Sequence, residues 1–173
     1  MKRTRLHHRF IRNEDGAAAI EFAILALPLF MIIFAILELS VMFFIDTSLD
    51  SALQRNARLI KTGQAAEAKM PLAAFKTAIC KDVAYMLSCN DKLLINVSVV
   101  SDVASVGGLD LIDGEGNISF TENFNIGNGS DYILVQAMLP WSPVVSLYSL
   151  SSQTLADGSY LLGASALFRN EPF

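Results

Sequence analysis

The stretch at residues 17–45, AAAIEFAILALPLFMIIFAILELSVMFFI, decides how the chain is organised. Its only ionisable residues are Glu21 and Glu38, and no charge interrupts it between Phe22 and Leu37. At about 1.5 Å of rise per residue, a helix of this length exceeds the roughly 30 Å hydrocarbon thickness of a bilayer. The stretch therefore predicts one transmembrane helix, with a kink or a locally melted turn at Pro28, which lacks a backbone donor.

The charges on either side of this stretch predict the direction in which it crosses. The first sixteen residues hold five Lys or Arg against two acidic residues, or +3, and residues 17–173 hold eight against fifteen, or −7. Basic residues stay on the cytoplasmic side of a membrane. We therefore expect a cytoplasmic basic leader at 1–16, a transmembrane helix at 17–45 and a periplasmic domain at 46–173, in a protein of the bacterial inner membrane. The acidic exterior argues against nucleic acid as a partner.

The overall composition fits this division. With 53% hydrophobic residues and a mean hydropathy of +0.43, the chain of 173 residues is more apolar than a typical soluble domain. The excess lies in residues 17–45, and the remainder is long enough for one modest folded unit.

Two helical patterns follow the predicted span. Apolar residues recur at three- and four-residue spacing until Gly63, which predicts that the membrane helix continues as an amphipathic rod; they are Leu49, Ala52, Leu53, Ala57 and Ile60. A second helix is expected to begin at Pro71, a favoured first-turn residue, and to carry an apolar stripe formed by Phe75, Ile79, Val83 and Met86.

After Asn90 the apolar pattern changes to a period of two. The runs that show it are KLLINVSVVS at 92–101, DYILVQAML at 131–139, VVSLYSL at 144–150 and SYLLGASALF at 159–168, with a weaker candidate, NISFTENF, at 117–124. An antiparallel sheet of about four or five strands packed on the helices accounts for these runs. The expected fold class is therefore α+β.

Cys80 and Cys89 are the only cysteines, and both fall in the region expected outside the inner membrane. An oxidising compartment lets such a pair persist as a disulfide. Nine residues of continuous helix would hold the two Cα atoms about 13 Å apart, whereas a disulfide needs less than about 7 Å. We therefore expect the second helix to end near Ser88 and the chain to turn back. The alternatives, a redox couple or a metal site, lack the CxxC spacing.

Little in the sequence suggests catalysis. His7 and His8, the only histidines, lie in the leader, which excludes a His-dependent triad or a His-ligated zinc in the exported region. A Ser/Lys arrangement stays open, although no SxxK motif is present. We expect neither an enzyme nor a cofactor.

Side chains with oxygen atoms that could bind calcium are concentrated in one short run of the sequence. Asp110, Asp113, Glu115 and Asn117 fall in the run LDLIDGEGNISF, but Ile118 stands where a calcium loop requires glycine. The run predicts a hairpin or a loop rich in turn-forming residues rather than a metal site.

The last part of the sequence holds two further features. Trp141 stands between two prolines, and we expect its indole to cover an edge of the core rather than to form a patch for a partner. The final segment FRNEPF is polar enough to be a frayed tail, although Arg169 and Glu171 could pair across a strand end.

The most specific motif stands at the start of the span. A charged leader is followed by Gly16, four small or apolar residues, Glu21, an aromatic residue and the membrane span. With GAAAIEF at 16–22 and ALPLF at 26–30, this order resembles the start of type IV pilin-type proteins, and it is most similar to the TadE-like pseudopilins of tight-adherence (Flp-type) pilus systems. The single span, the two exported cysteines and the ending LFRNEPF also resemble TadE-like proteins. Major Flp pilins are very short, so the long exported region argues against the main filament subunit.

The resemblance implies a minor pilin-like subunit in pilus assembly. In such proteins a membrane-embedded aspartic prepilin peptidase cuts after the glycine, so the cut falls between Gly16 and Ala17, and Glu21 becomes the fifth residue of the mature chain. The partners so implied are the prepilin peptidase, other pilin-like subunits, pilus-assembly membrane proteins and the lipid bilayer.

Glu21 also has a physical interpretation that stands beside the resemblance. A carboxylate in hydrocarbon costs a few kcal/mol and usually marks a partner or a function. Cleavage would create a cationic amine at Ala17, which on a neighbouring subunit could pair with Glu21 and set the axial register. The alternative is that Glu21 snorkels to the headgroups.

Glu38 lies about 100° around the helix from Glu21 and about 25 Å along it. The two carboxylates therefore cannot share a proton or a metal. Glu38 is expected near the outer headgroups or against another helix.

A second interpretation of the chain remains open. In this interpretation the chain is an unprocessed single-pass membrane protein whose periplasmic domain binds an envelope partner, and the spacing of Gly16 and Glu21 is a coincidence. A removed secretory signal peptide is disfavoured because the apolar run is too long and no A-x-A site closes it.

Overall fold

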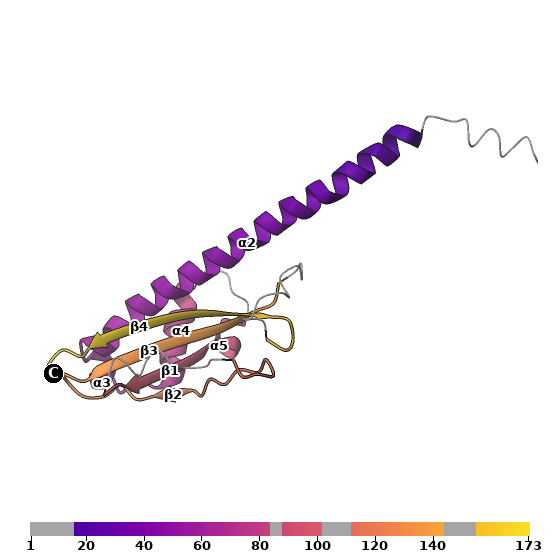
Figure 1. Cartoon of the computed structure of the whole chain (residues 1–173). Coiled ribbons are helices and arrows are strands. Elements are labelled where there is room, and N and C mark those ends of the chain that lie inside the picture. The colour runs from indigo at the N-terminus through magenta and orange to yellow at the C-terminus, as the bar shows by residue number, and fades with distance from the viewer. Residues whose placement is uncertain (1–15, 84–87, 102–111, 144–154) are drawn as a thin grey trace, which may run out of the picture. The chain divides into compact units, whose positions relative to one another are not determined.

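The computed structural model of the chain describes residues 16–83, 88–101, 112–143 and 155–173 (Figure 1). It separates into two compact units, Met1–Glu38 and Leu39–Phe173. The predictions of a strand at 144–150, of Met86 in the second helix and of Asp110 in the acidic loop lie outside the described residues.

The longest element, helix α2, extends over Ala17–Lys61. Within the first unit its large apolar side chains are exposed, with Phe22 at 70% and Leu25 at 71% of their full accessible surface. Among the described residues α2 is the one helix long and apolar enough to cross a membrane. The helix continues through Pro28 without interruption, so the locally melted turn that the sequence allowed does not occur.

In the second unit α2 buries the predicted amphipathic face. All five residues of the sequence pattern are buried, together with Ile45 and Asn56; the five are Leu49, Ala52, Leu53, Ala57 and Ile60. The helix ends at Lys61, and Gly63 follows with a left-handed φ of 77°, a conformation that glycine adopts without strain. The end predicted at Gly63 is therefore confirmed.

Three shorter helices follow: α3 at Gln64–Glu67, α4 at Leu72–Asp82 and α5 at Cys89–Lys92. Pro71 stands at the N-cap of α4, and α4 buries Phe75 and Ile79. The expectation that this helix continues to near Ser88 is wrong, because α4 ends at Asp82 and Val83 is already extended. Val83 is still buried, so its apolar character reflects the core and not a further turn of helix.

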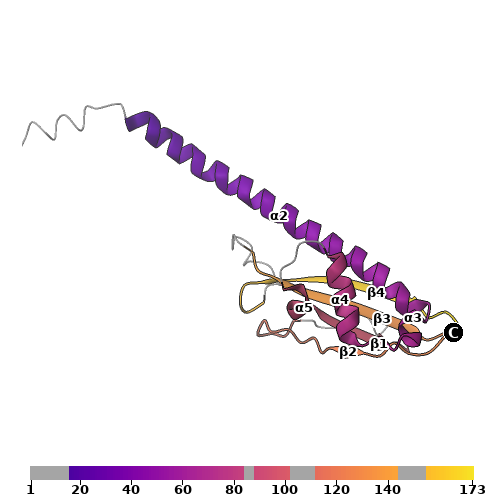
Figure 2. The same ribbon diagram turned by 180° about the vertical axis from the view of Figure 1, so that it is seen from behind.

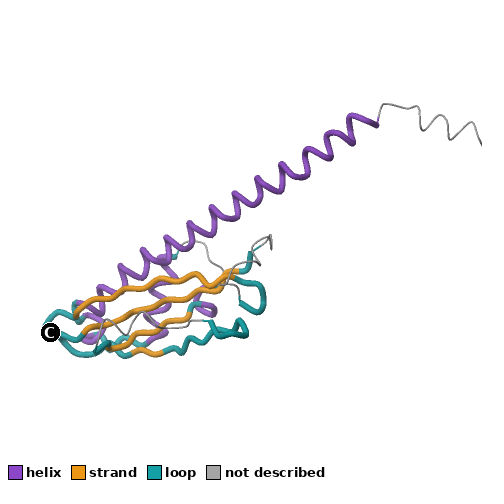
Figure 3. The backbone as a smooth tube through the Cα atoms, in the orientation of Figure 1, coloured by secondary structure: helices purple, strands orange, loops and turns teal. Residues whose placement is uncertain are grey.

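Within the described residues the sheet has four strands, β1 at Leu94–Val99, β2 at Asn123–Phe124, β3 at Tyr132–Trp141 and β4 at Tyr160–Arg169, in the order β2-β1-β3-β4 (Figure 3). β3 pairs with β1 and β4 in the expected antiparallel sense. The pair β1–β2 is parallel, which differs from the purely antiparallel sheet that we expected. The long connection between these strands allows the chain to return and run in the same direction. The sheet is thus mixed, and the α+β class is confirmed.

One layer of helices covers one face of this sheet. Figure 2 shows α4 and the second half of α2 lying across the same face. Alternate strand residues point into the shared core, among them Ile95 and Val97 of β1 and Val135 of β3. Beside β2, the Glu122 carboxylate accepts a hydrogen bond from the Ile95 amide at 3.0 Å and pairs with Lys76 of α4. This contact holds the segment that leads into β2 against both β1 and α4.

The segment after β4 is anchored rather than frayed. Asn170 is only 3% exposed, and its side-chain amide donates to the carbonyl oxygens of Ile126 and Asn128 at 2.9 and 3.0 Å. The Glu171 amide donates to the carbonyl of Lys61, the last residue of α2, at 2.8 Å. The frayed tail predicted for FRNEPF is therefore wrong: backbone carbonyls far away in sequence accept hydrogen bonds from the Asn170 side chain and the Glu171 amide.

Candidate functional site

Gly16 and Ala17 stand at the start of α2, and both are exposed. Gly16 is not among the glycines with a left-handed φ, and a Cβ atom added to it would meet nothing within 4 Å. The local fold therefore does not require a glycine here.

Glu21 lies one helical turn after Ala17, about 6 Å along the axis and on the same side of α2. Its own side chain is exposed, and so are the large apolar side chains on either side, with Ile20 at 63% and Phe22 at 70%. The carboxylate thus stands on a surface that is otherwise apolar. In a bilayer this surface would be in lipid or against other helices, and the charge would need a partner or access to the headgroups.

Glu38 does not join Glu21. Because α2 is one continuous helix, the seventeen residues between them correspond to about 25 Å along the axis and about 100° around it. Glu38 is also half-buried whereas Glu21 is exposed. The structure therefore does not bring the two carboxylates of the span together in one site.

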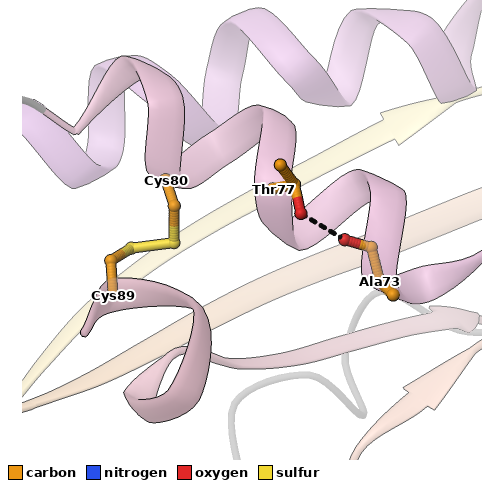
Figure 4. Close-up of a disulfide and its surroundings, with 4 residues drawn as sticks. All are labelled: Ala73, Thr77, Cys80 and Cys89. Atoms are coloured by element: carbon orange, nitrogen blue, oxygen red, sulfur yellow. Dashed lines mark hydrogen bonds between the residues drawn. A yellow bond between two sulfur atoms is a disulfide. The ribbon is translucent and has the colours of Figure 1, made fainter.

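The two cysteines are joined. Cys80 on α4 and Cys89 on α5 form a disulfide with a Cα–Cα distance of 5.7 Å (Figure 4). One turn before Cys80, the Thr77 hydroxyl donates to the carbonyl of Ala73 at 2.9 Å, within α4. Since α4 ends before Cys89, the chain has turned back and the sulfur atoms meet, as the sequence argument requires.

The described part of the acidic loop forms a tight turn. The Asp113 carboxylate accepts hydrogen bonds from the backbone amides of Glu115 at 2.9 Å and Asn117 at 2.8 Å. These hydrogen bonds lower the pKa of Asp113 below its ordinary value, and the bond from the Asn117 backbone amide contributes most. Ile112 and Ile118 pair as an antiparallel bridge across the turn. The carboxylate oxygens thus organise a hairpin, as the sequence predicts, and no three His, Cys, Asp or Glu side chains gather for a metal ion among the described residues.

Trp141 ends β3 and packs, partly buried, against the core. This is the core-edge position that the sequence favoured over a partner-facing patch.

A comparison with known proteins adds to this geometry. Residues 16–58 match the TadE-like protein family. The matched TadE-like segment begins at Gly16 and covers the apolar half of α2 and most of its amphipathic half. The resemblance to TadE-like proteins inferred from the motif is therefore confirmed. Residues 16–58 are thus similar to TadE-like proteins, a family connected with tight-adherence pili.

The TadE-like segment leaves out the sheet and the disulfide. No curated protein and no solved structure matched the chain. The folded region after residue 58 therefore has to be interpreted from its own geometry.

One contact near the end of α2 was missed by the sequence reasoning. A Cβ atom on Gly63 would lie 2.5 Å from the ring of Phe173, so the tail packs directly on this glycine. The only local signal was Gly63 itself, which we interpreted as a helix terminator. Nothing in the polar composition of the tail indicated that a distant glycine would receive its aromatic ring.

Proposed function

We propose that the chain is a minor pilin-like (pseudopilin) subunit in the assembly of a tight-adherence (Flp-type) type IV pilus. A prepilin peptidase cuts it between Gly16 and Ala17. Residues 17–45 anchor it in the bacterial inner membrane with the N-terminus in the cytoplasm, and residues 46–173 lie in the periplasm. The domain contacts other pilin-like subunits and pilus-assembly proteins, and its role is structural rather than catalytic.

The observation that carries this proposal is a coincidence of boundaries. The TadE-like segment begins at Gly16, and α2 begins at the next residue. A cut after Gly16 would therefore remove the whole charged leader and leave a chain that starts with the membrane helix. The exposure of both residues supports access by a peptidase.

Cleavage also gives Glu21 a role. A new amine at Ala17 would carry a positive charge on the apolar surface where Glu21 carries a negative one. Between neighbouring parallel helices shifted by about four residues, or about 6 Å, the amine and the carboxylate would lie at the same height. Pairing offsets the desolvation of both groups and favours this shift over others.

The mass of the mature chain, purified from membranes of cells that process other prepilins, tests the proposal. We expect the loss of residues 1–16 and a new N-terminus at Ala17. Gly16→Leu should leave the chain at full length. Because a side chain at Gly16 meets no atom within 4 Å, this variant tests processing and not folding.

Gly114→Leu is the matched control, since Gly114 is equally open but lies in the exported region. It should be processed like the wild type. A wild-type chain that keeps its leader would contradict the proposal and support the alternative, an unprocessed single-pass protein that binds an envelope partner. Such an anchor would also keep its function with Gly16→Leu.

A further inference from the structure

In the second unit, α2 has a polar face opposite the one it buries in the core. We call this face the outer stripe; its members are all exposed and are Thr47, Asp50, Ser51, Gln54, Arg58 and Lys61. At about 100° per residue they fall within an arc of about 100° on the side away from the buried residues. Gln54 donates to the Ser165 carbonyl at 3.4 Å, so the outer stripe borders strand β4.

The charges on the outer stripe are separated by sign along the helix. Asp50 lies near the predicted membrane surface, whereas Arg58 is about 12 Å and Lys61 about 16 Å further along the axis. The two ion pairs between described residues join Arg55 to Asp82 and Lys76 to Glu122. Asp50, Arg58 and Lys61 take part in neither, so their charges face outward.

We propose that the outer stripe is a contact surface between copies of this chain, in which Asp50 of one copy meets Arg58 and Lys61 of the next. The proposal rests on the proposed function, which supplies parallel neighbours, because copies inserted in one membrane by the same rule point the same way. Without a shift, parallel copies would place Asp50 against Asp50 and Arg58 against Arg58. A shift of eight to eleven residues, about 12–16 Å, replaces this repulsion by attraction, and it concerns a different neighbour from the one at about four residues that would pair Ala17 with Glu21.

A shifted parallel contact uses different parts of the stripe on the two copies. The acidic end of one copy and its basic end meet different neighbours, so the contact does not close into a symmetric dimer. Exposed ion pairs are weak and are screened by salt. Their contribution is therefore to select the register, while the apolar span supplies most of the association.

Cysteine crosslinking of the full-length chain in membranes tests this register. Ser51→Cys and Thr62→Cys are expressed as two separate single variants in the same cells, which leaves every charge of the stripe intact. The positions are eleven residues apart, as Asp50 and Lys61 are, and the native cysteines are bonded to each other and do not react. With a short bis-maleimide we expect the mixed dimer, which joins position 51 of one copy to position 62 of the next, to exceed both like dimers several-fold.

The charges are then tested in the same assay. Asp50→Lys should abolish the excess of the mixed dimer, and adding Arg58→Glu and Lys61→Glu to the same chain should restore it. Lys81→Glu with Asp91→Lys, exposed residues on α4 and α5, is the control and should change nothing. Equal amounts of like and mixed dimers, an insensitivity to Asp50→Lys, or crosslinking only to another protein would each overturn the proposal.

This outcome can be separated from that of the proposed function. A chain cleaved at Gly16 but without the mixed dimer contradicts the register alone. A chain that keeps its leader but forms the mixed dimer contradicts only the processing.

Discussion

At the scale of single residues, Glu21 and Gly16 are unusual because the fold does not need either of them. Glu21 is exposed on an apolar helix face, and Gly16 has open space where a side chain would stand. A carboxylate that contributes nothing to its own unit and costs free energy in lipid usually marks a partner or a function. Substitutions can separate such residues from those that hold the fold.

Glu21→Gln should stop assembly without affecting the folded unit. The amide keeps the size of the side chain but cannot pair as an ion with the amine at Ala17. We expect the variant in the membrane at normal abundance, cleaved normally, and at least tenfold reduced in the sheared pilus fraction, measured by immunoblot. Glu21→Asp, which retains the charge, should recover part of the loss. Full pilus formation by the Glu21→Gln variant would remove the electrostatic basis of the proposal.

A second residue-scale prediction concerns the turn before β4. The Ser159 hydroxyl and amide donate to the Asp157 carboxylate at 2.6 and 2.9 Å, and the hydroxyl bond is the main cause that lowers the pKa of Asp157. Because the folded pKa lies below the unfolded value of about 3.9, the stabilisation is present above that pH and is lost as the pH falls through the folded pKa. It should therefore be complete at neutral pH.

Ser159→Ala removes that hydroxyl and should lower the Tm of the full-length protein in detergent by a few degrees at pH 7. Asp157 is exposed, so solvent limits the size of the effect. The difference from wild type should narrow as the pH falls through the lowered folded pKa of Asp157, below which the carboxyl is protonated in both states. A difference that stays constant from about pH 7 to about pH 2 would assign the loss to packing of the buried Ser159 instead.

At the scale of elements, the least self-sufficient piece is α5. It has four residues, and a helix of this length is not stable alone in water. The disulfide ties it to α4, and Cys89 is buried at 5% exposure. We infer that the disulfide fixes the position of α5, from which the chain enters β1 at Leu94.

Replacing both cysteines by alanine should lower the free energy of unfolding by about 3 kcal/mol, from the entropy of the closed loop. Urea unfolding followed by circular dichroism measures this. Reduction of the wild type should produce a similar loss. If the reduced and oxidised wild-type proteins unfold at the same urea concentration, the disulfide does not stabilise the fold and has another role.

At the scale of the whole molecule, the two units differ in what they need from their surroundings. The buried core lies entirely within Leu39–Phe173, and the apolar side chains of residues 17–38 are exposed. A protein begun at residue 39 should therefore be soluble, monomeric and folded, with the Tm of the full chain in detergent. Aggregation of this fragment or a much lower Tm would show that the core depends on the apolar half of α2.

Much of this architecture follows from patterns that are local in the sequence. The extent of α2 follows from an apolar run joined to a three-four periodicity, and Gly63 marks its end. Strands β1 and β4 follow from alternation, as in Ile95 and Val97, whereas β3 is buried on successive residues and follows from its run of β-favouring residues. The candidate site could be predicted from the sequence for the same reason, since Gly16 and Glu21 stand at a fixed spacing beside a charged leader.

The features that were missed depend on contacts between distant residues. β2 is only the last two residues of the weaker candidate run at 117–124, and its parallel pairing, which the sequence did not indicate, is set by the long return from β1. α4 ended early because Val83, although apolar, joins the core from an extended backbone. The tail is fixed by bonds from Asn170 to residues more than forty positions earlier, which no local pattern encodes.

The bond from the Glu171 amide to the last carbonyl of α2 has a mechanical consequence if the chain is, as we propose, a subunit pulled through α2. Tension along α2 reaches the sheet by two parallel paths: the covalent chain through Gly63, and a strap made by residues 170–173 that continues directly from β4. Because both paths act at the far end of the helix, the load arrives as shear across the packed face. Shear strains many side-chain contacts at once, so the unit resists extraction better than one that could be peeled away turn by turn.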